Sequence, residues 1–168
     1  EGITCWPVVE IVHPAAGITA DDSADAARHR LRLLVDGEPD VAERLASLTG
    51  LSDSSYPLSE LFWAVRRLLA LLGASRTVVV QIDDAHWAEP TLAELVAHLA
   101  EADDAPVMVV LSARPELRER HGELLDGAGE AVDLEPLSAA DANRVIANVL
   151  GDDGLPVGAT VTYTWSKT

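Results

Sequence analysis

Apolar positions in the first part of the chain repeat with the spacing of α-helices. The clearest segment begins after Pro57, and its apolar side chains recur every three or four residues. They are Leu58, Leu61, Phe62, Val65, Leu68, Leu69 and Leu72. This spacing places them on one face of a helix with about 3.6 residues per turn, as in a helix that faces a core. Arg66 and Arg67 fall off that face, so we predict that they are solvated.

Three shorter segments with similar spacing precede this helix. They are predicted as helices over about Trp6–Val12, Ala24–Leu34 and Val41–Leu48. Proline inside a helix removes a backbone donor and crowds the preceding turn, so Pro14 is expected to end or kink the first helix early. Gly50 is expected to close the third helix, because glycine readily takes the left-handed conformation at a helix C-terminus.

After Leu72 the pattern changes to strands that alternate with helices. The runs Thr77–Ile82 and Val107–Leu111 are mostly apolar and β-branched, and Ala131–Leu134 is a shorter third run. Helices are predicted to begin at Pro90 and after Ser138. Ser138 is expected to cap its helix, with Asp141 three residues later in capping-box position. The core-facing side of the first of these helices is predicted to be Leu92, Leu95, Val96 and Leu99. That of the second is predicted to be Ala142, Val145, Ile146 and Val149, and Gly151 is expected to end this helix. Alternating strands and helices indicate βαβ units and a parallel sheet, so the expected fold class is α/β.

Two adjacent carboxylates end the first predicted strand. Asp83 and Asp84 follow the apolar run directly. Ligands of open α/β sheets bind at the carboxyl ends of the strands, and a strand in the middle of such a sheet is buried on both faces. In P-loop nucleotide hydrolases an Asp at that place holds Mg²⁺ beside the triphosphate. A buried strand that runs into a plain acidic turn is the alternative, but the longer string DDAHWAEPT is far less common by chance.

The sequence lacks the lysine of a phosphate-binding loop. Such a loop has the pattern G-x-x-x-x-G-K-[ST], in which the lysine reaches the β- and γ-phosphates. The single lysine is Lys167, and Ser166 stands where the glycine before it belongs. The sequence therefore contains half of a nucleotide site. Because it begins at Glu1, we expect an internal fragment whose phosphate-binding loop lies upstream.

The excess of acidic over basic residues argues against two classes of binding partner, nucleic acids and anionic membranes. The 168 residues include 28 acidic and 12 basic side chains, which give a formal net charge of −16. Nucleic acids and anionic membranes attract basic surfaces, so we expect this segment to bind neither directly. Cys5 is the single cysteine and cannot form an intrachain disulfide, which favours a reducing, cytoplasmic location. The sequence shows no long apolar span and no signal-peptide pattern.

Residues 156–168 differ in character from the rest of the chain. The stretch VGATVTYTWSKT alternates small or polar residues with Val161, Tyr163 and Trp165. This alternation is typical of an edge strand. A foreign extension of the chain is an equally open interpretation.

Five segments together resemble one protein family. They read EGITCWPVVEIV, YPLSELFWAVRRLLALL, VVVQIDDAHWAEPTLAELVAHLA, VLSARPEL and LEPLSAADANRVI. They are similar to the AAA-type ATPase domains of large bacterial regulators, the STAND class of signal-transduction ATPases. Such domains occur in LuxR-type transcriptional activators and beside class III adenylate and guanylate cyclase domains. The resemblance covers residues 1–155, in which residues 1–72 are helical and residues 73–155 carry the Walker B and sensor motifs. It implies a three-layer α/β/α P-loop fold, here with an incomplete parallel sheet and an N-terminal helical insert.

The resemblance also implies roles for individual residues. Asp83 matches the Walker B aspartate that binds Mg²⁺, and Asp84 takes the place of the acid that orients the attacking water. Arg114 matches a sensor residue that contacts the γ-phosphate, a task that suits the permanently charged, forked guanidinium. A solvated arginine before a helix is the alternative for Arg114. His86 and Trp87 are expected to pack and orient the loop after the strand.

The function implied by the resemblance is an ATP·Mg²⁺-dependent regulatory switch with slow hydrolysis, silent in this fragment alone. Its implied partners are ATP in the intact domain and other proteins or domains of the same chain. Two alternatives stay open: a non-catalytic acidic helical module that holds a protein partner, and a decayed gene product. Several residues depart from the family pattern, Cys5, His13 and Pro14 among them, and two departures lie in or after the first strand. Gln81 places an amide in a strand and needs a buried polar partner, and Glu89 is a poorer helix cap than the usual Asp.

Overall fold

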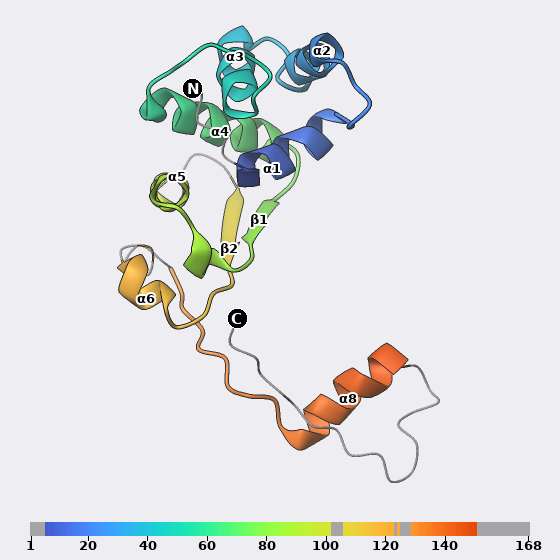
Figure 1. The fold of residues 1–168 in the computed structure, drawn as a ribbon, viewed down its shortest axis with the longest axis vertical. Helices are drawn as coiled ribbons and strands as arrows, with labels where there is room; N and C mark the ends of the chain where they lie inside the picture. Colours follow the sequence, from blue (N-terminus) through green and yellow to red (C-terminus); the bar gives the residue numbers. More distant parts are fainter. Residues whose placement is uncertain (1–5, 102–105, 123, 125–128, 151–168) are drawn as a thin grey trace. The chain divides into compact units, whose positions relative to one another are not determined.

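The structure, a computed structural model, describes residues 6–101, 106–122, 124 and 129–150 (Figure 1). The chain divides into two units, Glu1–Gly129 and Glu130–Thr168. The first unit contains α1 (Trp6–Ala16), α2 (Ala24–Leu34), α3 (Pro39–Leu48), α4 (Leu58–Gly73), β1 (Val78–Ile82), the 3-10 helix η1 (Ala85–Trp87), α5 (Pro90–Ala100), β2 (Val107–Leu111) and α6 (Leu117–Arg120). The second unit contains α8 (Ala139–Leu150). Among the residues described, no helix is both long and apolar enough to cross a membrane.

The predicted helical segment is confirmed, and α4 lies at its centre. The apolar stripe of α4 is buried at Leu61, Phe62, Val65, Leu68 and Leu69, and partly buried at its two ends. It packs against the apolar faces of α1, α2, α3, α5 and the two strands in one continuous core. As predicted, Gly50 closes α3. It has a φ of 73°, and the hydrogen bonds Gly50 N–H to Ser47 O and Leu51 N–H to Ala46 O end the helix as a Schellman motif.

Pro14 was expected to end or kink the first helix early, and the early end is wrong. Helix α1 continues two residues beyond Pro14, to Ala16. Proline is tolerated here because it sits in the last turn, where few backbone bonds remain to be broken. The stop comes instead from Gly17, whose φ is 66°. The Gly17 N–H bonds to Pro14 O (3.1 Å) and the Ile18 N–H to His13 O (2.8 Å), which again forms a Schellman motif.

An ion pair joins the start of α3 to the outer face of α4. Arg67 is exposed, as predicted, but its guanidinium is not free of partners: Nε lies 2.7 Å from Glu38 Oε2 and 2.8 Å from Oε1. The hydrogen bonds from Arg67 lower the pKa of the Glu38 carboxyl, desolvation opposes them, and the positive charge of Arg67 adds to the lowering. A carboxyl with a lowered pKa stabilises the fold above its unfolded-state pKa, and this stabilisation is lost as the pH falls through the folded-state pKa.

We therefore expect Glu38→Gln to destabilise the chain at pH 7 by a small amount that disappears in acid. Urea midpoints of wild type and variant should differ at pH 7 and converge below the ordinary glutamate pKa of 4.5. Glu94→Gln, a change at an exposed position of α5, is the control and should show no such pH-dependent difference. A Glu38→Gln effect of equal size at pH 7 and pH 3 would contradict the assigned ion pair.

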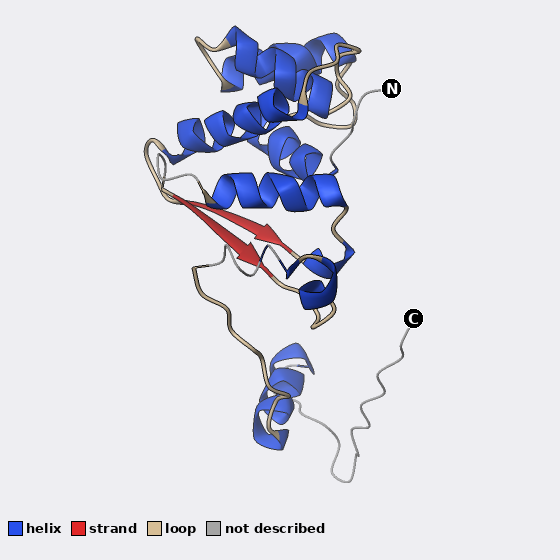
Figure 2. Cartoon of the chain, turned by 90° about the vertical axis from the view of Figure 1, so that its left-hand side faces the viewer, coloured by secondary structure: helices blue, strands red, loops and turns tan. Residues whose placement is uncertain are grey.

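The two strands form a parallel pair joined by a helical crossover, as the sequence predicts. Val78 pairs with Val107 and Ile82 with Leu111 at the two ends of the register. Figure 2 shows the strand pair beneath a stack of helices. The side chains of alternate positions, Val80 and Val109 among them, face this helical layer and join its core. Parallel strands of this kind place their carboxyl ends at one shared edge, which here follows Ile82 and Leu111.

The opposite face of the sheet is bare among the described residues, which corrects the expectation that β1 is buried on both faces. Val79 is 59% exposed, Met108 57% and Val110 37%. Gln81, predicted to need a buried partner, is exposed as well. Successive side chains of a strand point to opposite faces, so one helical layer buries only every second position. The α/β class with a parallel sheet is thus confirmed, and the third layer of the expected α/β/α arrangement is not seen in the part of the chain that the structure describes.

The second unit departs from prediction at its start and agrees with it at its helix. Residues 131–134 form no strand, and Val132 and Leu134 are 71% and 90% exposed. A strand needs a neighbour to satisfy its backbone groups, and no described strand pairs with this segment. Ser138 caps α8 as predicted: its Oγ accepts from the Asp141 N–H at 3.2 Å and donates to Asp141 Oδ2 at 2.7 Å. Ala142 is buried, whereas Val145, expected on the inner face, is 49% exposed. The predictions for the Val149 side chain, Gly151 and residues 156–168 lie outside the described residues.

Candidate functional site

The carboxylate of Asp83 is held at the shared carboxyl edge of the two strands. Its Oδ1 accepts a hydrogen bond from the Ser112 hydroxyl at 2.7 Å and one from the Gln81 amide at 3.1 Å. Ser112 directly follows β2, so the hydrogen bond links the ends of the two strands. Gln81 thereby finds a partner, although at the surface rather than in the interior where it was expected. Asp83 Oδ2 accepts no hydrogen bond from another described residue, which leaves that oxygen directed at solvent.

The same hydrogen bonds fix the charge of Asp83. Donation from Ser112, and then from Gln81, lowers the pKa of the Asp83 carboxyl below its ordinary value of 3.8, with a weak opposing effect of desolvation. Hydrogen bonds to a carboxylate favour its charged form because they stabilise the negative oxygen. Asp83 is therefore an anion at neutral pH, with one oxygen engaged and the other available to a cation.

Asp84 differs from Asp83 in backbone and in surroundings. It has φ 52° and ψ 37°, the left-handed conformation, and it is the one non-glycine residue with positive φ in the described part of the chain. Its side chain is 75% exposed, and its Oδ1 lies 3.9 Å from His86 Nδ1. A left-handed aspartate turns the chain out of β1 and into η1. The two neighbouring carboxylates therefore occupy distinct positions.

His86 is buried and contacts the loop after β2, in agreement with the prediction, whereas Trp87, expected to pack with it, is mostly exposed. Its side chain is 4% exposed, and its Nδ1 accepts a hydrogen bond from the backbone N–H of Arg114 at 3.3 Å. Because Nδ1 accepts, the proton of the neutral ring sits on Nε2. Trp87 is 64% exposed, and its ring lies 5.2 Å from that of His86, centroid to centroid.

The Arg114 side chain is exposed, and the structure ties it to the site only through its backbone. The N–H of Arg114 bonds to His86, while the guanidinium makes no hydrogen bond or ion pair with another described residue. Ser112, two residues earlier, contacts Asp83. The structure therefore brings Asp83, Asp84 and the Arg114 backbone to the same edge of the sheet, and it leaves the Arg114 guanidinium free to reach a ligand.

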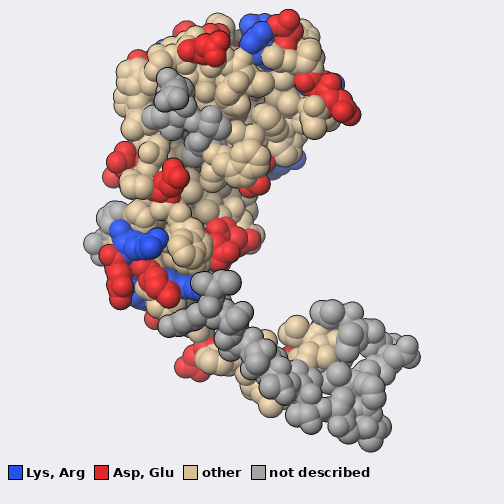
Figure 3. Space-filling view, in the orientation of Figure 1, with Lys and Arg blue, Asp and Glu red and all other residues tan. Residues whose placement is uncertain are grey.

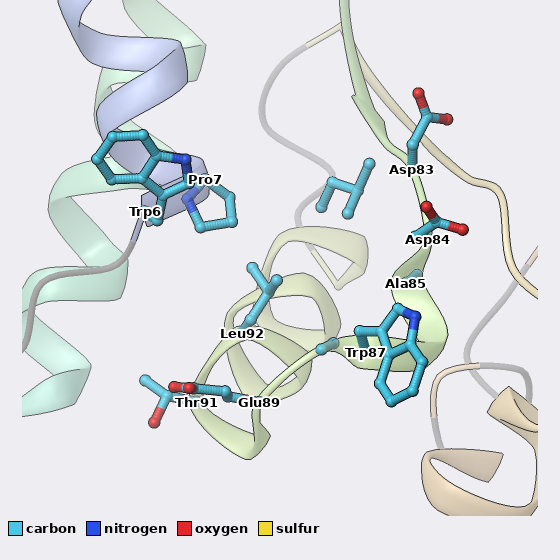
Figure 4. Close-up of a pocket in the computed structure, with 11 residues that line it drawn as sticks. Trp6, Pro7, Asp83, Asp84, Ala85, Trp87, Glu89, Thr91 and Leu92 are labelled. Atoms are coloured by element: carbon cyan, nitrogen blue, oxygen red, sulfur yellow. The ribbon is translucent and has the colours of Figure 1, made fainter. Parts of the chain in front are cut away.

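A pocket of about 360 Å³ opens beside the two aspartates. It is lined by Trp6 and Pro7 from α1, by Ile82 and the Asp83–Asp84 pair, and by residues of η1 and the start of α5 (Figure 4). In Figure 4, Trp6 and Pro7 lie across the gap from Asp83 and Asp84, with Leu92 between them. Sequence reasoning assigned Trp6 to a helix face and missed this role.

The residues present fit a divalent cation better than they fit a triphosphate. Carboxylate oxygen is the preferred ligand of Mg²⁺, and Asp83 Oδ2 is open to it. No cluster of three His, Cys, Asp or Glu side chains able to hold a metal occurs among the described residues, so Asp83 and Asp84 need further oxygen ligands from elsewhere. No Lys or Arg is among the residues that line the pocket. Acidic side chains also outnumber basic ones on the face of the first unit seen in Figure 3.

Comparison of the chain with protein-family models, with curated proteins and with solved structures found no match.

Proposed function

We propose that the chain is the Mg²⁺-binding and sensor portion of an ATP-dependent regulatory switch domain of the STAND type. One observation carries the proposal. An ionised aspartate follows a parallel strand directly, is held there by a serine that follows the neighbouring strand, and keeps one carboxylate oxygen open. This is the place where open α/β sheets bind ligands. The resemblance of DDAHWAEPT and SARPE to this family supports the same assignment.

Three residues take distinct roles in this proposal. Asp83 would hold Mg²⁺, Asp84 would orient the water that attacks the γ-phosphate, and Arg114 would contact that phosphate. When bound, Mg²⁺ would neutralise part of the phosphate charge. Hydrolysis is slow and resets the switch, and the partners are ATP and other proteins or domains of the same cytoplasmic regulator.

Besides Arg114, the phosphate groups need the lysine of a phosphate-binding loop, which this sequence does not contain. The pocket is lined by three carboxylates, Asp83, Asp84 and Glu89, and by no basic side chain. Without a lysine and a nest of backbone N–H groups, a triphosphate would meet mainly like charge there. The proposed switch therefore works only in a longer protein that also carries a phosphate-binding loop.

The test uses such a longer protein, with the chain alone as its reference. Asp83→Ala is expected to weaken Mg²⁺-dependent ATP binding at least tenfold, because it removes the cation ligand. Asp84→Ala is expected to leave the affinity within about threefold and to slow hydrolysis by roughly 10²-fold or more, the usual contribution of a positioned proton acceptor. Isothermal titration calorimetry with ATP and Mg²⁺, and single-turnover hydrolysis, measure the two effects.

The two carboxylates serve as matched controls for each other, since each substitution removes one charge from the same loop. Equal loss of affinity in both variants would show that their roles are wrongly separated. Micromolar ATP binding by the chain alone would overturn the requirement for a separate phosphate-binding loop. Unchanged affinity in Asp83→Ala would overturn the proposed function.

The bare sheet face favours a second function, the non-catalytic binding of a protein partner. Val79, Met108 and Val110 form an exposed apolar surface on the two strands, and exposed apolar surfaces often mark interaction sites. A partner bound there would leave the Asp83 edge unused. Equal partner binding by wild type and Asp83→Ala, with no response to nucleotide, would favour this second function.

A further inference from the structure

The loop after the aspartate pair is held in a conformation that its own residues do not favour. Asp84 has a φ of 52°, a conformation that costs free energy for residues with a Cβ, although aspartate tolerates it better than most. Inside the loop, the Asp84 carbonyl accepts from the Trp87 N–H at 2.9 Å and the Ala85 carbonyl from the Ala88 N–H at 3.0 Å. These two local bonds form the single turn of η1.

One side of the loop is fixed by the segment that follows β2. The Ala85 N–H donates to Ser112 O at 2.9 Å, and the Arg114 N–H donates to His86 Nδ1 at 3.3 Å. Both contacts lie at the level of the strand ends. They secure the entry of the loop and the His86 ring, but they leave the carbonyl oxygens of His86 and Ala88 to be satisfied by other groups.

The C-terminal end of α6 supplies those groups. Arg120 Nη1 lies 3.4 Å from the His86 carbonyl oxygen, and its guanidinium carbon lies 5.4 Å from the centre of the Trp87 ring. His121 Nε2 lies 3.0 Å from the Ala88 carbonyl oxygen. Leu117, one turn earlier, is buried in a small cluster with Ala85. Two consecutive basic residues thus hold two carbonyls of the loop, while the apolar residue of the same helix anchors α6 beneath it.

We propose that Arg120 and His121 are positioning residues for Asp84. They clamp the His86 and Ala88 carbonyls, so that the chain stays left-handed at Asp84 and the Asp84 carboxylate keeps its direction beside Asp83. The functional meaning of that direction rests on the proposed ATP-dependent switch, but the clamp itself is a property of the folded chain. Because Arg120 and His121 belong to the segment after β2, a movement of that segment would also move the aspartate loop.

The experiment measures the conformation of Asp84 in the chain without nucleotide. Arg120→Ala and His121→Ala are compared with wild type and with Glu119→Ala. Glu119 is exposed on α6, and its side chain makes no hydrogen bond or ion pair with another described residue. The readouts are NMR: the Asp84 backbone shifts and three-bond coupling, which report the sign of φ, and hydrogen exchange at the Trp87 amide. Both clamp variants should move the Asp84 signals away from left-handed values and speed Trp87 exchange at least tenfold, with Glu119→Ala unchanged.

Two further variants separate the clamp from general stability. Arg120→Lys keeps the charge and a donor, so it should restore part of the Trp87 protection. Asp84→Gly accepts positive φ at little cost, so Arg120→Ala should speed Trp87 exchange much less in that background than in wild type. Exchange at the core amides of Leu68 and Val80 reports overall folding. If Arg120→Ala raises exchange at these as well, the comparison is made with Arg120→Met, which keeps the side-chain stem over Trp87 and removes only the donors.

The outcomes are decisive in both directions. Asp84 signals and Trp87 exchange that stay at wild-type values in the Arg120 and His121 variants would overturn the clamp. An equal change in Glu119→Ala would also overturn it, because the effect would then belong to α6 as a whole. No nucleotide enters these measurements, so failure of the proposed ATP switch and failure of the clamp are distinguishable.

Discussion

Leu68→Ala is expected to destabilise the chain by about 2–5 kcal/mol, the usual range for a fully buried leucine truncated to alanine. Leu68 lies in the middle of α4 and is 0% exposed. The core around it joins α1, α2, α3, α5 and both strands, so the cavity is bounded by several elements that cannot all move in to fill it. Small domains are typically stable by roughly 5–15 kcal/mol, so this one change removes a large fraction.

Urea unfolding followed by far-UV circular dichroism measures the effect. Leu33→Ala is the matched control, because Leu33 is a leucine in a neighbouring helix, α2, that is 63% exposed. Its truncation should change stability by about 0.5 kcal/mol or less, as is usual for surface positions. Similar losses at Leu68 and Leu33 would mean that α4 is not the centre of the core.

The helical segment was predictable from the sequence because its determinants are local. The bounds of α2 match the prediction, and α3 differs only at its start, because apolar spacing and Gly50 act within one or two helical turns. The seven-residue stripe of α4 had one consistent interpretation. Pro14 was misjudged since the sequence does not show how close a proline lies to the natural end of its helix.

The sheet was predictable in type but not in extent. The β-branched runs around Val80 and Val109 indicated strands, and the helix between them indicated a parallel pair. The exposure of Val79 and Met108 could not be predicted. The composition of a strand shows that its side chains suit a buried surface, but it does not show whether a helical layer covers that surface. Residues 131–134 have strand-like composition for the same reason, and without a neighbouring strand they do not pair.

The site was partly predictable. The position of Asp83 at a strand end followed from the apolar run before it, and Ser112 could have been found by the same reasoning at the end of the second run. The contributions of Trp6 and Arg120 could not be predicted from the sequence, because these residues reach the site through packing between segments far apart in the sequence. The left-handed conformation of Asp84 was also unpredicted, although aspartate is among the residues that tolerate it.

The last prediction concerns the bare face of the sheet, which we expect to drive self-association. Val79, Met108 and Val110 expose apolar side chains on two strands, each with a single neighbour in the described sheet. Exposed strand edges next to an apolar face favour pairing between chains. The net charge of −16 opposes such contacts by mutual repulsion. Salt screens this repulsion, with a Debye length of about 10 Å at 0.1 M and about 3 Å at 1 M. Association should therefore strengthen as salt is raised.

The triple variant Val79→Thr, Met108→Gln and Val110→Thr should weaken this association by at least tenfold. Threonine keeps the β-branched shape that suits a strand, so stability should change little. Sedimentation velocity between 0.05 and roughly 1 M salt measures the association, and thermal unfolding checks the fold.

Leu33→Gln, which removes an exposed apolar side chain from α2, is the control and should leave association unchanged. Two results would show that the bare face of the sheet does not mediate self-association. Wild type would stay monomeric at high salt, or Leu33→Gln would suppress association as strongly as the triple variant. Association that weakens with salt would instead point to contacts between opposite charges.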